Sequence, residues 1–318
     1  MRAKTENTSK EIFIKDLRKQ ISANSCFVIM EKEVKVAKNG KKYIEMVIGD
    51  KTGTMIARKF GSFLDTTEGS NLEIKDLFNK IELGSIYIIK GKIEEFPKDS
   101  GKFNMVIHKI VKTKNFNLED YQPEAQSNRA LNIKYVKDQV SFMKDEAYKK
   151  LVCCFMESEY WEDFIEMPSA IKHHHNYNSG NLEHSVNVLK ICSTLQHCYK
   201  DLNKDLLAAG ALLHDLGKIK TYSMDKTMVT MTTEGETFGH LYLSTKLLED
   251  LFVRYHAVNG EPFPEEHKAA LMHLILSHHG DVSNGWGSVV DPNTPEAIVL
   301  HYADLLDSRA KGKLQEQL

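Results

Sequence analysis

The sequence predicts a multidomain protein, with an N-terminal all-β barrel followed by an all-α helical bundle. Apolar and polar residues alternate over positions 26–113, whereas apolar residues recur at helical spacing from Ile133 onward. Thirteen of the fourteen histidines lie beyond residue 170, so imidazole chemistry is expected in the helical part. A chain of 318 residues has room for two domains, each with its own core.

Five strands are expected in the first half, separated by turn-forming residues. Lys38-Asn39-Gly40-Lys41 is typical of a hairpin turn. The expected strands are Cys26–Val36, Lys42–Gly49, Thr54–Phe60, Ser85–Phe96 and Phe103–Lys112, with a partly helical stretch at Asn71–Ile81. Five strands interrupted by a helix after the third indicate a Greek-key barrel of the OB type, and another small β-barrel is the alternative.

A polar segment without alternation separates the two patterns. We expect a barrel domain over residues 11–115, a linker over 116–132 and a helical domain over 133–318. Prolines fall between the expected helices, where they do not interrupt hydrogen bonding. These helices are 133–157, 159–166, 182–199, 204–214, 240–256, 265–279 and 295–317.

The two halves carry opposite charge. Residues 1–115 hold 23 Lys/Arg and 15 Asp/Glu, a net charge of +8, and the remainder holds 19 and 29, a net charge of −10. A basic domain beside an acidic one fits a polyanion-binding module joined to a carboxylate-using domain. Two unrelated domains that simply differ in charge are the alternative.

Composition argues against a membrane protein or a disulfide-stabilised one. No apolar run approaches 18 residues, and the N-terminus lacks the apolar core of a signal peptide. The five cysteines form no CxxC pair, which favours reduced thiols. We therefore expect a cytoplasmic protein that does not bind membranes.

Histidines and aspartates gather at the expected helix ends. Gly180–His184 places a histidine near a helix start, and His214-Asp215 ends an apolar run just before Gly217. Gly239-His240 opens another helix, and His278-His279-Gly280 ends one. Polar residues converging from several helix ends suit a metal site built from imidazole and carboxylate ligands.

Counting the donors predicts two metal ions. His184, His214, Asp215 and Asp304 would complete one site with positions left for water. His240, His278 and His279 are too many additional ligands for the same ion, but they would hold a second ion if Asp215 bridges. Two ions about 3.5–4 Å apart would hold a bridging hydroxide and clamp a phosphodiester.

Other polar residues have alternative interpretations. Lys218 would place a cation on a substrate phosphate, or it is a solvated lysine. His175, in the internal run His173-His174-His175, either lines the site or does not. The remaining helical histidines are expected to be core or surface residues: His197, His256, His267, His273 and His301.

The pattern H…HD…D, here His184, His214-Asp215 and Asp304, resembles the HD phosphohydrolase superfamily. Gly239-His240 and Ser277-His278-His279-Gly280 resemble its two-metal branch. The segment 174–184 is similar to that family's HHxYxGGLLEH motif, although Ser179 replaces the first glycine and Asn181 a leucine. The resemblance implies an all-α HD domain and a metal-dependent hydrolase.

With an OB-type domain in front, residues 11–310 resemble the YhaM-type 3′→5′ exoribonucleases of low-GC Gram-positive bacteria. This resemblance implies removal of nucleotides from a 3′ end, supported by manganese or cobalt. Neither the polarity nor the metal follows from residue spacing.

The barrel is expected to bind the nucleic acid. OB folds bind a strand across their second and third strands by stacking bases on aromatic rings and matching phosphates with basic residues. Residues of this kind on those strands are Lys42, Tyr43, Arg58, Lys59 and Phe60, with Lys92 and Phe103 as extensions. Core packing of the aromatic residues is the alternative.

We expect, in sum, a two-metal exonuclease with Asp215 as the bridging ligand and Lys218 and Arg309 neutralising phosphate charge. Mn²⁺ is the expected ion, with Co²⁺, Fe²⁺, Ni²⁺ and Zn²⁺ as alternatives, and single-stranded RNA or DNA is the substrate. A homo-oligomer that covers Trp161, Phe164 and the C-terminal helix is a further expectation. The rival functions are a cyclic-dinucleotide or nucleotide phosphohydrolase and a nucleic-acid-binding regulator with a vestigial HD site.

Overall fold

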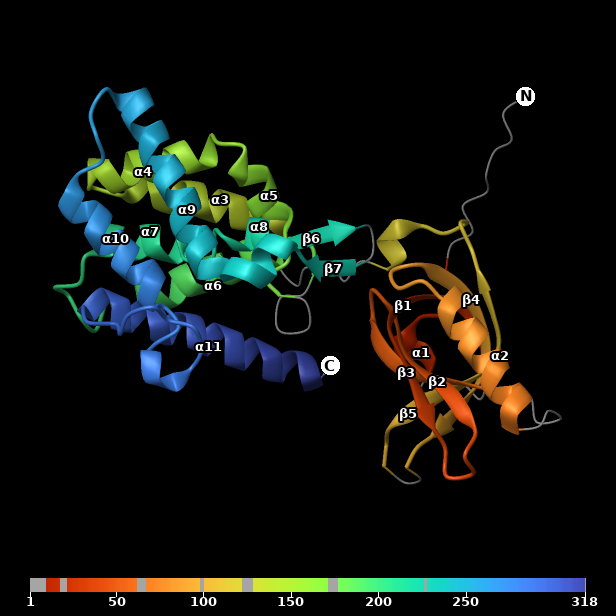
Figure 1. Cartoon of the computed structure of the whole chain (residues 1–318). Coiled ribbons are helices and arrows are strands. Elements are labelled where there is room, and N and C mark those ends of the chain that lie inside the picture. The colour runs from red at the N-terminus through yellow and green to blue at the C-terminus, as the bar shows by residue number, and fades with distance from the viewer. Residues whose placement is uncertain are drawn as a thin grey trace, which may run out of the picture. The chain divides into compact units, whose positions relative to one another are not determined.

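The computed structural model describes residues 10–17, 22–61, 67–97, 100–121, 128–170, 177–225 and 228–317. The chain divides into two compact units, Met1–Glu124 with Asp225–Met228, and Ala125–Met224 with Val229–Leu318. The first unit is a β-barrel and the second is a helical bundle (Figure 1). The predicted fold class is confirmed. None of the helices in the described part of the chain is long and apolar enough to cross a membrane.

The first unit is a closed barrel with the strand order β1-β2-β3-β5-β4. Its strands are β1 (Ser22–Val36), β2 (Lys42–Asp50), β3 (Gly53–Phe60), β4 (Ile86–Glu95) and β5 (Phe103–Lys112). A parallel contact between β3 and β5 closes the barrel, and the other pairs are antiparallel. Helix α2 (Thr67–Lys80) follows β3, and α1 (Ile14–Leu17) and the 3-10 turn η1 (Leu118–Asp120) flank the strands. This is the predicted OB order.

Strand alternation fills the barrel interior. Ile44, Met46 and Ile48 on β2 are fully or almost fully buried, as period-2 alternation requires. Burial of a side chain of this size contributes about 1.5–3 kcal/mol. Phe103 also packs against this core, so it does not extend the outer face with Tyr43.

The second unit is a helical bundle around one hydrophobic core. Its helices are α3 (Arg129–Phe142), α4 (Glu146–Met156), α5 (Tyr160–Glu166), α6 (Gly180–Leu195), α7 (Lys204–Leu213), α8 (Lys218–Thr221), α9 (Thr233–Asn259), α10 (Glu265–Ser277) and α11 (Pro295–Gln317), with the 3-10 turn η2 (Val282–Asn284). Leu212 and Leu213 on α7 and Leu274 on α10 are fully buried in this core. Apolar packing therefore fixes the helix ends that carry the histidines.

The single helix predicted over residues 133–157 is wrong, because the chain forms α3 and α4 with a break at residues 143–145. The carboxylate of Asp145 accepts hydrogen bonds from the N–H groups of Ala147 and Tyr148, which caps a new helix start. Helix α3 begins at Arg129, four residues earlier than expected, since Asn128 caps it in the same way.

The sequence pattern missed the short hairpin of β6 (Tyr222–Asp225) and β7 (Met228–Met231). It also missed the first turns of α9, which begins at Thr233 rather than at His240. Gly239 interrupts that helix with φ 71° and ψ 160°, and helical geometry resumes at His240. Trp161 and Phe164, expected at an interface between copies, lie in the core with their rings stacked at 5.9 Å.

Candidate functional site

Two groups of potential metal ligands lie at converging helix ends of the helical unit. His184, His214 and Asp215 form one group, and His240, His278 and His279 form the other. In each group, one ligand atom from every member lies within 4.8 Å of the others. The predicted ligands therefore come together, although they are spread over some 95 residues of sequence from α6 to the end of α10.

Asp304 from α11 joins the first group. Its Oδ1 lies 3.2 Å from Nε2 of His184, whose Nε2 lies 3.3 Å from Nε2 of His214. The first group thus offers two imidazoles and two carboxylates. Its composition is the one that the residue spacing predicted.

Asp215 lies between the two groups, with one carboxylate oxygen facing each. Its Oδ2 is 3.2 Å from Nε2 of His214 and 3.4 Å from Nε2 of His184. Its Oδ1 is 3.5 Å from Nε2 of His240 and 3.9 Å from Nε2 of His278. A carboxylate shared in this way has the geometry of a bridging ligand.

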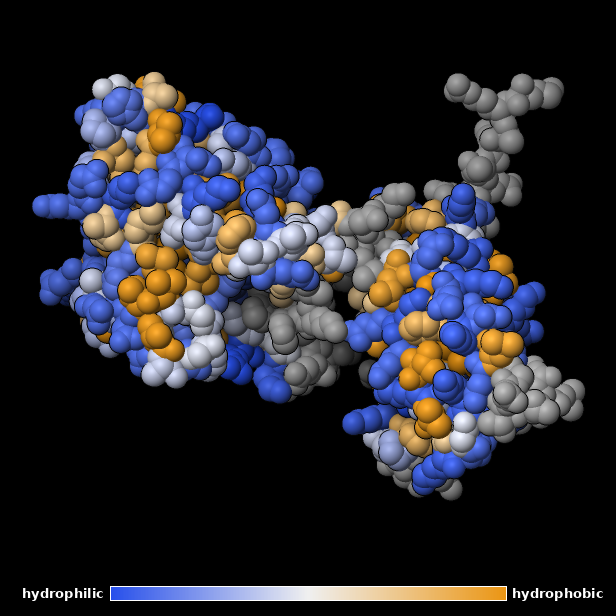
Figure 2. Space-filling view, viewed as in Figure 1, coloured by the Kyte–Doolittle hydropathy of each residue, from blue (hydrophilic) through white to orange (hydrophobic). Residues whose placement is uncertain are grey.

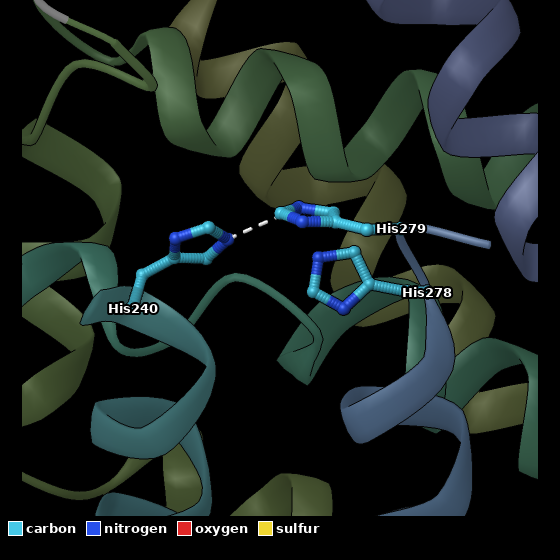
Figure 3. A group of neighbouring side chains, drawn as sticks. All are labelled: His240, His278 and His279. Carbon is cyan, nitrogen blue, oxygen red and sulfur yellow. Dashed lines mark hydrogen bonds between the residues drawn. The ribbon is translucent and has the colours of Figure 1, made fainter. Parts of the chain in front are cut away.

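The three histidines of the second group turn their rings toward one another (Figure 3). His240 enters from α9, whereas His278 and His279 follow the end of α10. The Nε2 atoms of His240 and His279 lie 3.2 Å apart. Two such lone-pair atoms at this separation suit a shared cation.

Backbone carbonyls fix the orientation of three imidazoles. The Nδ1–H groups of His214, His278 and His279 donate to carbonyl oxygens at 3.0, 2.7 and 2.7 Å, respectively. Because a carbonyl can only accept, Nδ1 carries the proton and Nε2 keeps its lone pair toward the centre. This is the tautomer that a metal ligand needs.

Two buried ligand atoms have no hydrogen-bond partner among the described residues, namely Oδ1 of Asp215 and Nε2 of His278. Leaving such groups unpaired costs about 1–3 kcal/mol each. The two atoms lie 3.9 Å apart on the side of Asp215 that faces the second group, where a cation would satisfy both. The residues present therefore fit a divalent metal.

The charge distribution differs between the two groups. Burial lowers the pKa of His184, but the carboxylates of Asp215, Asp304 and Asp307 outweigh burial and raise it well above the usual value. Burial lowers the pKa of His240 to about 3 and that of His278 well below its usual value. The first group therefore attracts positive charge, and the second presents neutral imidazoles that can act as ligands.

Two glycines allow these residues to approach one another. A Cβ on Gly217 would meet the backbone oxygen of His240 at 2.2 Å, so α9 packs directly against the turn that carries Asp215. Gly217 has an ordinary helical φ of −61°, so close packing against α9, and not an unusual backbone conformation, explains the glycine. Gly280 has φ 88° and redirects the chain after His279.

Lys218 lies inside the centre rather than in solvent. Its Nζ is 2.6 Å from Oδ2 of Asp215 and donates to Oγ of the buried Ser169 at 3.0 Å. Burial lowers the pKa of Lys218, but Asp215 outweighs burial and raises it above the usual value. The lysine is therefore a buried cation held on the carboxylate of Asp215.

The sequence did not single out Asp307, which supports the first group. Its Oδ2 accepts a hydrogen bond from Nδ1 of His184 at 2.8 Å, and its Oδ1 accepts one from Nδ2 of Asn187 at 3.0 Å. Asp307 is three residues after Asp304, which places both on one face of α11. The three-residue spacing from Asp304 is the sequence feature from which Asp307 could have been predicted.

On the barrel, Tyr43 and Phe60 occupy one face. They are cross-strand partners on β2 and β3, and their ring centroids stack at 5.0 Å. The next outward pair is Glu45 and Arg58, joined by a 2.8 Å ion pair. Tyr43 and Glu45 on β2 therefore share one outward face of the barrel with Phe60 and Arg58 on β3.

Lys42 and Lys59 do not lie on the same barrel face as Tyr43 and Phe60. Lys59 is paired with the inward Ile44, and its Nζ donates to the carbonyl of Phe60 at 3.0 Å. Lys42 has the same parity at the start of β2 but is exposed. These lysines border the Tyr43–Phe60 pair without sharing its face. His175 lies outside the described residues.

The chain is similar to known proteins in both its barrel and its helical unit. The HD domain family model matches residues 181–309, which span the candidate metal ligands from His184 to Asp304. The 3′-5′ exoribonuclease YhaM of Oceanobacillus iheyensis is 30% identical over 274 residues, covering 85% of this chain and 79% of that protein. The YhaM of Bacillus subtilis is 26% identical, covering 95% of this chain and 88% of that protein. The YhaM of Listeria monocytogenes is 27% identical over 89% of this chain and 84% of that protein.

Proposed function

The chain belongs to the YhaM 3′-5′ exoribonuclease family, and from this premise we propose that it shortens single-stranded RNA from the 3′ end with two divalent ions bridged by Asp215. The reaction is hydrolysis of a phosphodiester bond. Single-stranded DNA is proposed as a second substrate, because the aromatic barrel face recognises bases by stacking rather than by their sugars.

The division of the Asp215 carboxylate between two ligand groups carries this proposal. One oxygen faces His184 and His214, and the other faces His240 and His278, at separations of 3.2–3.9 Å. Because the two oxygens face two separate sets of imidazoles, the arrangement favours two ions over one. The two buried atoms without a hydrogen-bond partner, Oδ1 of Asp215 and Nε2 of His278, lie on the side of the second group.

Divalent ions bound there, with Mn²⁺ as the first candidate and Co²⁺, Fe²⁺, Ni²⁺ or Zn²⁺ as alternatives, would supply a hydroxide nucleophile and stabilise charge on the phosphate. The protein residues do the positioning. Lys218 neutralises part of the buried negative charge of Asp215, and Ser169 keeps the ammonium in place. No side-chain nucleophile is required by this arrangement.

The barrel would add affinity for the strand. The stacked rings of Tyr43 and Phe60 offer a platform for bases, and Arg58 lies next to them with its guanidinium 5.1 Å from the ring of Phe96. Base stacking on such a platform is worth about 1–3 kcal/mol per base. Sequence-tolerant stacking suits an enzyme that removes successive nucleotides.

A time course on 5′-labelled single-stranded RNA with Mn²⁺ tests the proposal. The wild-type protein is expected to produce a ladder of progressively shorter labelled products, and Asp215→Ala is expected to leave the RNA intact. Asp201→Ala, an exposed carboxylate in the turn after α6, serves as the matched control. Release of the labelled 5′ nucleotide first would refute the polarity, and intact RNA with wild-type protein would refute the nuclease function.

A further inference from the structure

An exposed tryptophan lies beside the metal centre without a role in the function described above. Trp286 follows η2 in the segment between α10 and α11, and 48% of its surface is exposed. The other tryptophan of the chain, Trp161, is 7% exposed in the core. A half-exposed indole beside a hydrolytic centre is a candidate substrate contact.

Hydrogen bonds attach the backbone of Trp286 to a candidate metal ligand. Nδ1–H of His279 donates to the carbonyl of Trp286 at 2.7 Å. The N–H of Trp286 donates to Oδ1 of Asn284 at 2.7 Å, and Nδ2 of Asn284 donates to the carbonyl of His279 at 3.0 Å. Trp286 is therefore held next to His279 before any substrate binds.

A cation lies over the indole. The guanidinium carbon of Arg309 is 5.4 Å from the Trp286 ring, within the range of a cation–π contact. Arg309 is exposed on α11, five residues beyond the ligand Asp304. The indole and the guanidinium are thus both anchored to segments that carry ligands of the metal centre.

The segment that carries Trp286 also exposes two aliphatic side chains. Val282 and Val289 in the same segment are 48% and 61% exposed, respectively. Figure 2 shows apolar surface gathered over the end of α10 and the segment that follows it. A flat apolar group entering the centre would find contacts here, together with one positive charge.

We propose that Trp286 and Arg309 form the binding subsite for the base of the 3′-terminal nucleotide. The inference rests on the proposed nuclease function and adds the residues that receive the departing nucleotide. The indole stacks on the base, and Arg309 keeps the indole in place and offers its charge to the neighbouring phosphate. Stacking accepts every base, because each has a π face, so the subsite recognises a terminal base without reading its sequence.

A comparison of two RNA substrates across protein variants tests the contact between Trp286 and the terminal base. The value of kcat/KM is measured for RNA with an ordinary 3′-terminal nucleotide and for the same RNA with an abasic one. Loss of the base is expected to lower kcat/KM on the order of 10-fold in the wild-type protein, the factor that corresponds to about 1.4 kcal/mol of stacking. In Trp286→Ala the two RNAs are expected to be cleaved equally well, whereas Trp286→Phe is expected to restore much of the difference.

Two further variants are measured on the same two RNAs. Arg309→Ala is expected to reduce the preference for the base only in part, since the indole remains. Phe142→Ala removes an aromatic ring that is 75% exposed at the end of α3, and this control is expected to keep the full preference.

Fluorescence gives a readout that does not depend on turnover. In a Trp161→Phe background, Trp286 is the single indole, and RNA protected by phosphorothioate linkages is expected to quench its emission saturably. The abasic RNA is expected to quench it much less. If the background variant does not fold, the kinetic comparison above decides without it.

If removal of the terminal base lowered kcat/KM by the same factor in the wild-type protein and in Trp286→Ala, the proposed subsite would be wrong. Cleavage of RNA in that experiment would still support the proposed nuclease function. A Trp286→Ala variant with unchanged kinetics but an altered oligomeric state would also overturn it, and would assign the indole to a contact between copies. Absence of RNA cleavage by the wild-type protein would refute the proposed function instead.

Discussion

Replacing Asp307 is expected to weaken metal binding without removing any metal ligand. Asp307 is buried, and its carboxylate accepts from Nδ1 of His184 at 2.8 Å and from Asn187 at 3.0 Å. The carboxylate keeps the proton on Nδ1 and the lone pair on Nε2, and it raises the basicity of the ligand nitrogen. Without it, the His184 ring is free to rotate and to change tautomer.

The size of the effect follows from these contacts. A hydrogen bond to a charged group is worth about 1.5–3 kcal/mol, and loss of a carboxylate behind a ligating histidine typically costs 10–100-fold in metal affinity. We expect Asp307→Ala to weaken Mn²⁺ binding at the first group by about 100-fold and Asp307→Asn by about 10-fold, because the amide oxygen can still accept from Nδ1.

Isothermal titration of Mn²⁺ into chelator-treated protein measures this directly, with a thermal melt of each variant to show that it is folded. Asn187→Ala, which removes only the support of Asp307, is the matched control and is expected to lose less affinity than either variant. An unchanged Mn²⁺ affinity in folded Asp307→Ala would refute the reasoning that Asp307 orients His184.

Five further substitutions have expected outcomes. Asp145→Ala removes the cap of α4 and should lower the free energy of unfolding by about 1 kcal/mol at pH 7 in urea titrations. Burial raises the pKa of Asp145, but its hydrogen bonds in the folded state outweigh burial and lower it, so this contribution is present above about pH 4 and disappears as the pH falls through the lowered pKa. Ser179→Gly should raise the free energy of unfolding by about 1 kcal/mol, because Ser179 has φ 63°. Gly217→Ala should cost about 1–3 kcal/mol or more and weaken metal binding at the second group, because its Cβ would push α9 away. Tyr43→Ala and Phe60→Ala should each weaken RNA binding by about 1–3 kcal/mol in fluorescence polarisation, and the double variant by less than the sum, because the two rings touch.

Simple comparisons check these expectations. A Cβ on Gly312 of α11 meets nothing within 4 Å, so Gly312→Ala should leave metal binding unchanged. Val36, exposed at the end of β1, lacks an aromatic ring, and Val36→Ala should leave RNA binding unchanged. If Gly217→Ala bound metal as tightly as the wild-type protein, the close packing of α9 on the Asp215 turn would not control the second group.

The sequence was most informative where periodicity and chemistry agreed. The limits of β5 and α11 agree with the predicted ranges. The candidate ligands could be predicted without a structure because several imidazoles and carboxylates placed at the ends of apolar helices have few other uses.

The remaining features depend on contacts that spacing does not reveal. Whether Tyr43 and Phe60 share a face depends on strand register, which pairs them directly. Lys218 could be either a solvated residue or a buried one, and only the packing around Asp215 and Ser169 decides between them. Ser179 shows the same limit, since its unusual φ follows from the shape of the turn before α6.

The number of metal ions held per chain tests the central claim most directly. We predict two Mn²⁺ per chain by elemental analysis, with an electron paramagnetic resonance spectrum of a coupled pair, because Asp215 presents one oxygen to each ligand group. In folded Asp215→Ala, the coupled signal should be absent. One Mn²⁺ per wild-type chain, or a coupled pair that persists in Asp215→Ala, would contradict the bridging role, and a wild-type chain that binds no transition metal would indicate a nucleic-acid-binding protein instead.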